Sequence, residues 1–185
     1  MRRFLVTVFL LALAGGLAGC AATNAAYLAT NPNAPYTLGS GDRVRVIVFG
    51  QESLSNSYAV DGSGNISMPL IGVVNAKGQT TESLARSIEG KLRNGFLRDP
   101  QVSVEVEAYR PFFVLGEVTT PGQYPYINGM TAENAVAVAG GFTPRGYQGA
   151  VGLTRVIDGR SITVDVPINQ LIRPGDTILV HERLF

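Results

Sequence analysis

Apolar and polar residues alternate over several short stretches of the chain, and this spacing predicts β-strands. In residues 43–48 the valines share one face and the arginines share the other. In residues 102–107 the valines again share one face, opposite a serine and two glutamates. Each stretch is therefore expected to form a strand with one buried and one solvent-facing side. Between them, Pro69 and Gly72 interrupt a third apolar stretch and predict a strand that bends or lies at an edge.

Two other stretches change to helical spacing. Residues 78–92 place a leucine or isoleucine at each turn after Thr80, the predicted N-cap. A shorter helix is predicted to begin after Thr131 and to stop at Gly140. Both starts share the pattern Gly-x-Thr-x-Glu, which puts a carboxylate in the first helical turn.

The second half of the chain predicts further strands around its one helix. Residues 112–118 form an apolar strand, and a Pro-Gly turn follows it. Asp158-Gly159 separates two alternating stretches and predicts a hairpin. The expected fold class is α+β, with a compact unit over residues 36–109 and a β-rich unit with one helix over residues 110–185.

A second echo links the two halves. Gly41-Asp42 opens the first strand, and Gly175-Asp176 opens a strand near the end of the chain. Together with the repeated helix start, this similarity has two explanations. One is an internal duplication, and the other is that the same turn and capping chemistry was used twice; the sequence leaves both open.

The N-terminal residues read as an export signal. Arg2 and Arg3 precede an apolar run of residues 4–14, which is too short for the roughly 20 residues of a membrane-spanning helix. Small residues then lead to Cys20, the only cysteine of the chain, in a pattern that resembles the lipobox of bacterial lipoproteins. Residues 1–19 are expected to be a lipoprotein signal peptide. Residues 20–35 are expected to be a lipidated tether, anchored through Cys20.

The charge of the chain argues against nucleic acid as a partner. Removal of residues 1–19 takes away two of the 15 basic residues and none of the 14 acidic ones, which leaves 13 and 14 and a net charge of −1. Such a chain has no electrostatic attraction for a phosphate backbone. Charged residues make up only 16% of the sequence, below the roughly 25% of typical soluble domains. We interpret this low charge, with 22 glycines, as a fold of short strands and turns whose faces other chains cover.

The residues that could carry chemistry are few. His181 is the single histidine, which excludes a multi-histidine metal site and leaves no other base for a serine triad. Glu105, Glu107 and Glu117 are the candidate carboxylates for glycan hydrolysis, although carboxylates on an alternating strand are usually a solvated face. No phosphate-binding glycine loop is present. The sequence predicts a protein without catalytic residues, metal or cofactor.

Several motifs in order resemble one family, the outer-membrane polysaccharide export proteins. The first domain of that family opens as "YTLGSGDRVRVIVF" does here, continues with "VDGSGNISMPLIGVV" and a Gly-x-Thr helix, and ends with "DPQVSVEV". Its second domain, the soluble-ligand-binding β-grasp type, resembles "FFVLGEVTTPGQYPYINGMTAENAVAVAGGFT" with the closing strand "RPGDTILVHERLF". The resemblance covers residues 36–185. It implies a polysaccharide export domain over residues 36–109 and a β-grasp domain over residues 110–185.

The resemblance also implies a function and partners. Members that build their own pore have repeated β-grasp domains and a terminal amphipathic helix, whereas this chain has one such domain and ends at Phe185. It is expected to be a short, lipid-anchored member on the periplasmic side of the outer membrane, where Ala21 after the cysteine favours that membrane. Copies would form a ring around a polar passage for the polysaccharide. An inner-membrane polysaccharide copolymerase would dock below, and a separate outer-membrane β-barrel protein is a further possible partner.

Ring closure requires that one face of a copy contacts a different face of the next. The candidate contact points are the glycine-rich turns at Gly39, Gly41 and Asp42, and the turn at Gly122. The alternative function is a monomeric lipoprotein that binds a glycan or peptide in the periplasm as a scaffold or sensor.

Overall fold

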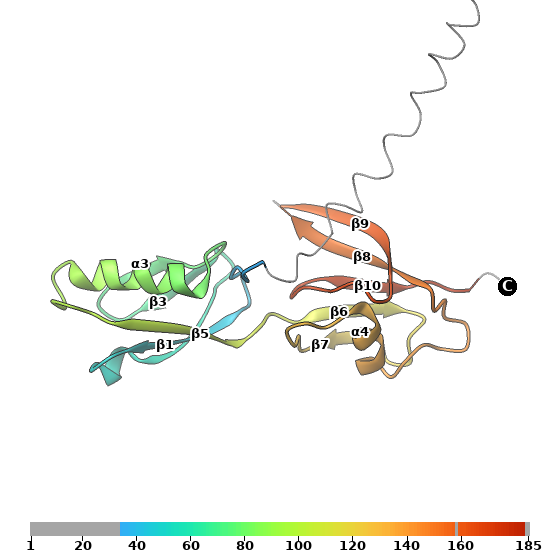
Figure 1. Cartoon of the computed structure of the whole chain (residues 1–185), viewed down its shortest axis with the longest axis horizontal. Coiled ribbons are helices and arrows are strands. Elements are labelled where there is room, and N and C mark those ends of the chain that lie inside the picture. The colour runs from blue at the N-terminus through green and yellow to red at the C-terminus, as the bar shows by residue number, and fades with distance from the viewer. Residues whose placement is uncertain (1–33, 158, 184–185) are drawn as a thin grey trace, which may run out of the picture.

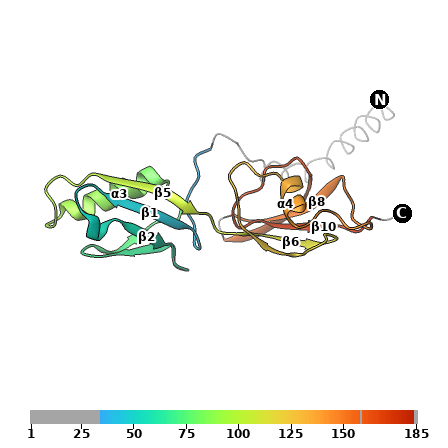
Figure 2. The same cartoon turned by 90° about the horizontal axis from the view of Figure 1, so that it is seen from below.

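The computed structural model describes residues 34–157 and 159–183, which form two halves joined end to end. Figures 1 and 2 show the halves one after the other along the long axis, connected by the segment between strands β5 and β6. The predicted signal peptide, Cys20 and nearly all of the predicted tether lie outside the described residues. The mixture of helices and sheets confirms the α+β class.

The N-terminal half contains two sheets and one α-helix. Its elements are β1 (Arg43–Val48), the 3₁₀ helix η1 (Glu52–Leu54), β2 (Asn56–Ala59), β3 (Asn65–Met68), β4 (Gly72–Asn75), α3 (Thr81–Arg93) and β5 (Val102–Ala108). β1 is the central strand of the order β2-β1-β5 and runs antiparallel to both neighbours. The valines of β1 are buried and its arginines are exposed, as the alternation predicts.

Helix α3 covers the inner face of this sheet. The Thr80 side chain accepts the Ser83 N–H at 3.2 Å, so the predicted N-cap is confirmed. Leu84, Ile88 and Leu92 are fully buried and pack with the valines of β1 in one apolar cluster. The spacing of these three residues is therefore what fixes the helix on the sheet.

The sequence missed part of the sheet organisation in this half. It predicts one strand interrupted at Pro69, whereas the structure forms a separate hairpin from β3 and β4 with residues 69–71 at its tip. It also does not predict β2 (Asn56–Ala59), in which Tyr58 is the one side chain that packs against the apolar cluster. β2 forms because its backbone pairs with β1, and no apolar alternation marks it.

The C-terminal half is a single five-stranded sheet with one helix. Its elements are β6 (Phe112–Gly116), β7 (Gly122–Tyr124), α4 (Ala132–Val138), β8 (Ala150–Ile157), β9 (Arg160–Pro167) and β10 (Thr177–Val180). The strand order is β7-β6-β10-β8-β9, and β10 runs parallel to β6 and antiparallel to β8. The predicted hairpin of β8 and β9 is confirmed. Gly122 is the first residue of β7, not part of the turn that the sequence suggests.

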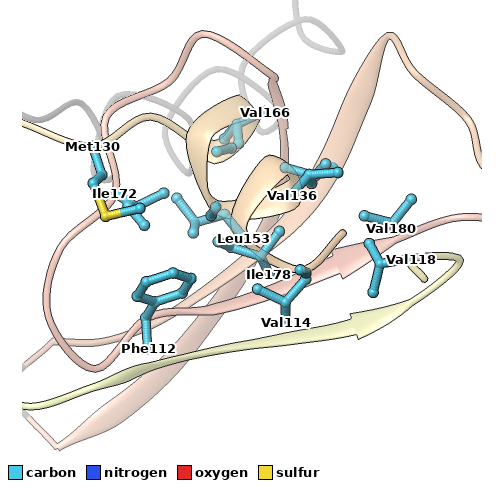
Figure 3. Packing of buried hydrophobic residues seen from close by; sticks show 14 residues of the cluster. Phe112, Val114, Val118, Met130, Val136, Leu153, Val166, Ile172, Ile178 and Val180 are labelled. Atoms are coloured by element: carbon cyan, nitrogen blue, oxygen red, sulfur yellow. The ribbon is translucent and has the colours of Figure 1, made fainter. Parts of the chain in front are cut away.

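Helix α4 closes the core of this half. Thr131 is its N-cap, and Thr131 and Asn134 satisfy each other's backbone N–H groups in a capping box. Figure 3 shows Val136 of α4 on the side of the core that also holds Val114, Ile178 and Val180, and Phe112 belongs to the same apolar cluster. Phe112, Val114 and Ile178 are fully buried, so the two central parallel strands carry the core.

One buried ion pair lies within this apolar core. The Arg155 guanidinium donates to both carboxylate oxygens of Asp176, from Nε at 2.9 Å and from Nη2 at 2.7 Å. The two residues are 5% and 1% exposed. A paired geometry of this kind offsets the cost of desolvating both charges.

We expect Arg155→Ala to destabilise the C-terminal half strongly. The substitution leaves the Asp176 charge buried and uncompensated, which lowers the free energy of unfolding by about 3–5 kcal/mol. Urea denaturation followed by circular dichroism measures the change. Arg145→Ala is the matched control, because Arg145 pairs with Glu182 at an exposed site, and its midpoint should stay close to that of the wild type. Equal midpoints for the two variants would contradict the prediction.

Candidate functional site

The segment that joins the two halves carries Arg110, whose side chain forms hydrogen bonds to both of them. Its backbone N–H donates to Asp42 Oδ1 at 2.8 Å. Its Nη1 donates to Asp42 Oδ2 at 3.2 Å and to Tyr36 Oη at 3.0 Å. On the other side, its Nε donates to the Pro174 carbonyl oxygen at 3.0 Å. Arg110 thus bonds both halves at once, and we call Tyr36, Asp42, Arg110 and Pro174 the Arg110 junction.

Asp42 is the acceptor at the centre of this junction. Its side chain is fully buried and accepts four hydrogen bonds, from Tyr36 Oη at 2.6 Å, the Gly39 N–H at 2.7 Å and two groups of Arg110. Burial, with the hydrogen bond to Asp42, raises the pKa of Tyr36 above its ordinary value. The Tyr36 hydroxyl therefore keeps its proton and donates it to the carboxylate.

Three glycines make room for the Arg110 side chain. A Cβ on Gly39 would lie 2.1 Å from Arg110 Nη1, and a Cβ on Gly175 would lie 2.9 Å from Arg110 Nε. A Cβ on Gly41 would lie 3.3 Å from Arg110 Cβ, and Gly41 also has a φ of +94°. Glycine is needed at these positions because backbone from both halves closes around one guanidinium.

The two Gly-Asp turns predicted from sequence have the same geometry. In the first, the Asp42 carboxylate accepts the Gly39 N–H at 2.7 Å, and in the second the Asp176 carboxylate accepts the Arg173 N–H at 2.7 Å. Each turn leads directly into a central strand, β1 or β10. The sheets around them differ, because β1 has two antiparallel neighbours and β10 has one parallel neighbour. The similarity in structure is thus that of the turn and its buried aspartate.

Tyrosine rings extend the junction across its surface. Tyr36 packs edge-on against Tyr109 with ring centroids 4.9 Å apart, and Tyr109 packs edge-on against Tyr126 at 5.4 Å. Tyr126 belongs to the C-terminal half, so the three rings also connect the halves. Such edge-to-face pairs stabilise by about 0.5–1.5 kcal/mol each beyond their burial.

A groove of about 360 Å³ opens beside these rings, along β5. We call it the β5 groove. Its walls are the start of α3, the C-terminal part of β5 and the tyrosines next to the junction. The lining residues are Pro35, Tyr36, Thr80, Thr81, Glu82, Val104, Glu105, Val106 and Tyr109.

The predicted contact residues Gly39, Gly41, Asp42 and Gly122 differ in their exposure to solvent. Gly39 and Asp42 are buried and bond within the chain, so they form no exposed contact surface. Gly41 is exposed, and Gly122 is half-buried at the edge strand β7. The sequence did not single out Arg110, which completes the junction. The only feature of the sequence that could have indicated Arg110 is its position between the alternating stretch that ends at Tyr109 and the apolar strand that follows.

The candidate catalytic residues do not come together. Glu105 and Glu107 lie on β5, where Glu107 accepts a hydrogen bond from Ser57 Oγ at 2.9 Å. Glu117 lies in the other half and accepts one from Thr143 Oγ1 at 2.6 Å. His181 is exposed and contacts Asp165 at 2.9 Å. Glu105 and Glu107 share the solvent-facing side of one strand, whereas Glu117 and His181 both lie in the other half.

Two further kinds of feature are absent from the described residues. Residues 34–157 and 159–183 contain no group of three or more histidine, cysteine, aspartate or glutamate side chains that could hold a metal ion. Within the same ranges, no helix has the length and apolar character to cross a membrane.

Comparison with known proteins identifies both halves. Residues 30–107 match the family "Polysaccharide biosynthesis/export protein", and residues 111–165 match the SLBB domain. Together these matches include β1 to β5 and most of the second sheet with α4.

Three similar proteins have names that refer to polysaccharide production, export or transport. The chain is 40% identical over 118 residues to the exopolysaccharide production protein ExoF of Rhizobium meliloti, an alignment that covers 57% of this chain and 28% of ExoF. It is 30% identical over 185 residues to the EPS I polysaccharide export outer membrane protein EpsA of Ralstonia nicotianae, covering 80% of this chain and 48% of EpsA. It is 27% identical over 128 residues to the polysialic acid transport protein KpsD of Escherichia coli, covering 68% of this chain and 23% of KpsD.

The chain spans about half the length of EpsA and about a quarter of the other two relatives. The matched family is described as polysaccharide biosynthesis/export, and EpsA and KpsD are named for polysaccharide export and transport, which supports the non-catalytic role that the sequence predicts. The order of an export domain and an SLBB domain, with relatives named for polysaccharide export, shows that this chain belongs to the polysaccharide export protein family.

Proposed function

We propose that this protein is a non-catalytic component of a conduit that carries capsule or exopolysaccharide across the periplasm to the outer membrane. The observation that carries the proposal is the family match of both halves, in the order export domain and then SLBB domain. The name of EpsA as a polysaccharide export outer membrane protein supports the site of action. The separation of Glu117, in the C-terminal half, from Glu105 and Glu107 on β5 supports a non-catalytic role toward the polymer.

The proposal assigns a domain to each half. Residues 36–109 form the polysaccharide export domain, and residues 110–185 form a β-grasp domain with β10 as its closing strand. The strand order β7-β6-β10-β8-β9 supports the β-grasp assignment, since the first and last strands lie parallel at the centre and one helix covers one face. The separate apolar clusters of the two halves support the boundary near Arg110.

The proposal further places the protein on the inner leaflet of the outer membrane, facing the periplasm, through lipid on Cys20. The support is the short apolar run and the single cysteine that follows it. Several acyl chains on one residue bind a bilayer durably, since each buried methylene contributes about 0.8 kcal/mol and a single chain is only marginal.

Copies of the protein assemble into a ring around a wet passage, with an inner-membrane polysaccharide copolymerase below it. The Arg110 junction supports this assembly, because hydrogen bonds from one side chain to both halves hold the long molecule as one unit. A fixed angle between the halves lets both halves of every copy repeat with the same symmetry around one axis.

We expect deletion of the gene to stop secretion of the polymer while synthesis continues. Polysaccharide should accumulate in the cells and decrease in the medium, and the wild-type gene should restore export. The Cys20→Ser variant should restore it poorly, because the protein loses its anchor. Measurement of secreted and cell-retained polymer, with membrane fractionation, tests both points. Unchanged secretion in the deletion strain would contradict the conduit and favour a monomeric binding lipoprotein.

We expect Arg110→Met to free the two halves from each other. Methionine keeps the approximate length of the side chain but removes the side-chain donors to Asp42, Tyr36 and Pro174, while the backbone N–H of residue 110 can still donate to Asp42. Small-angle X-ray scattering should show a broader distribution of distances within the variant, and secretion should fall. Arg145→Met removes an exposed arginine within one half and is the matched control. A scattering curve identical to that of the wild type would contradict the role of Arg110.

A further inference from the structure

The three-stranded sheet of the N-terminal half has an open edge at β5. The Phe49 N–H donates to the Gln101 carbonyl at 3.0 Å, which identifies this position as a hydrogen-bonded pair of the antiparallel ladder. Hydrogen-bonded pairs recur at every second residue, so Ser103 and Glu105 direct their backbone groups toward β1. Val104 and Val106 therefore direct theirs away from β1, where the described chain has no further strand.

The β5 groove runs along this open edge. Val104, Glu105 and Val106 form one wall, and the start of α3 forms the opposite wall. Backbone N–H and C=O groups left open along a strand are a template for another strand.

The opposite edge of the same sheet, at β2, is also open. The Val60 N–H donates to the Asp42 carbonyl at 2.8 Å, so the even-numbered residues of β2 bond to β1. Ser57 and Ala59 consequently direct their backbone groups away from β1. Asn56 Oδ1 accepts the Ser57 N–H at 2.8 Å and guards part of this edge, whereas no hydrogen bond to the Ala59 N–H is found in the described chain.

We infer that the β2 edge of one copy pairs with the β5 edge of a second copy, in the β5 groove, so that the sheet β2-β1-β5 continues from copy to copy. This inference rests on the self-assembly in the proposed function and names its contact surface. β2 and β5 both run antiparallel to β1 and thus parallel to each other, so the new pair is parallel. The contact joins two different edges of the same sheet, so it is a heterologous contact. Contacts of this type form a ring when the rotation between neighbouring copies closes.

Charge on the outer face of the sheet favours this partner. β1 presents Arg43 and Arg45 on that face, and β5 presents Glu105 and Glu107. β2 presents only the small side chains of Ser57 and Ala59 on the same face. In the proposed contact, β2 of the second copy therefore lies between the glutamates on β5 of the first copy and the arginines on β1 of the second copy.

A glutamate of β5 already contacts a residue two strands away within one chain. Glu107 on β5 accepts a hydrogen bond from Ser57 on β2 at 2.9 Å, across the intervening strand β1. A glutamate of β5 can therefore span two strand spacings. Across the proposed contact, the same span brings Glu105 or Glu107 to the arginines of the next copy.

Crosslinking between two variants, each with one introduced cysteine in addition to Cys20, tests the contact. One full-length variant carries Ala59→Cys and the other carries Glu105→Cys, each with its own epitope tag, and both are expressed together in the native host. Treatment of the membranes with a short bismaleimide should give a dimer that carries both tags. Neither variant alone should give it, because the contact joins unlike edges. Wild-type protein controls for Cys20, and Arg86→Cys on the exposed side of α3 replaces Glu105→Cys as the non-contact control.

The outcomes separate this inference from the proposed function. If wild-type protein extracted in mild detergent has the size of an assembly but the mixed dimer is absent, this contact is wrong and the ring stands. A dimer of the Glu105→Cys variant with itself would show pairing of like edges and would also overturn the contact. A wild-type protein that is monomeric in the membrane, by size and by chemical crosslinking, would overturn both.

A proline at the β2 edge gives an independent test. Ala59→Pro removes an N–H that faces away from β1 and leaves the ladder to β1 intact. Self-association should weaken by about tenfold or more. One hydrogen bond of the contact is lost, and the pyrrolidine ring of the proline sterically hinders the approach of the second copy. The thermal midpoint should stay within a few degrees of the wild type. Ala59→Val, which keeps the N–H, is the matched control. Equal assembly of the two variants at equal concentration would overturn the contact.

Discussion

The arrangement of the whole molecule depends on one buried carboxylate, that of Asp42. A buried charge needs a counter-charge and a full set of hydrogen-bond donors, and Asp42 finds them in Tyr36, the Gly39 backbone and Arg110. Since Arg110 also bonds the Pro174 carbonyl, satisfaction of this one group connects the two halves. The orientation between the sheets is thus set by electrostatics at their junction, whereas each half is held internally by its apolar core.

The same solution occurs inside the C-terminal half, with a different consequence. Asp176 follows a glycine of positive φ, accepts the backbone N–H three residues before it and pairs with a buried arginine. There the partner, Arg155, lies within the same sheet, so the pair specifies the packing of β8 against β10. The Gly-Asp turn is a local device, and the position of its arginine decides whether it stabilises a core or joins two units.

Small sheets leave much of their backbone at edges, and this constraint connects the fold to assembly. Two of the three strands of the sheet β2-β1-β5 are edge strands, so most of its length has unpaired backbone on one side. A long, low-charge chain with open edges and one rigid joint is suited to repeat with itself. The proposed conduit depends on such repetition rather than on catalysis, because a continuous passage for a polymer requires many copies.

The sequence by itself determined the elements whose residues carry their own signal. The valines of β1, the spacing of Leu84, Ile88 and Leu92, and the caps Thr80 and Thr131 follow from local periodicity and hydrogen bonding, and the motif order indicated the family. Only the tertiary structure decided the rest. β2 has no apolar pattern and exists through pairing with β1. Gly39, Gly41 and Gly175 belong together because they surround Arg110, which is separated from Asp42 by 68 residues of chain. Periodicity reports which face of an element is buried, but not which distant side chain arrives there.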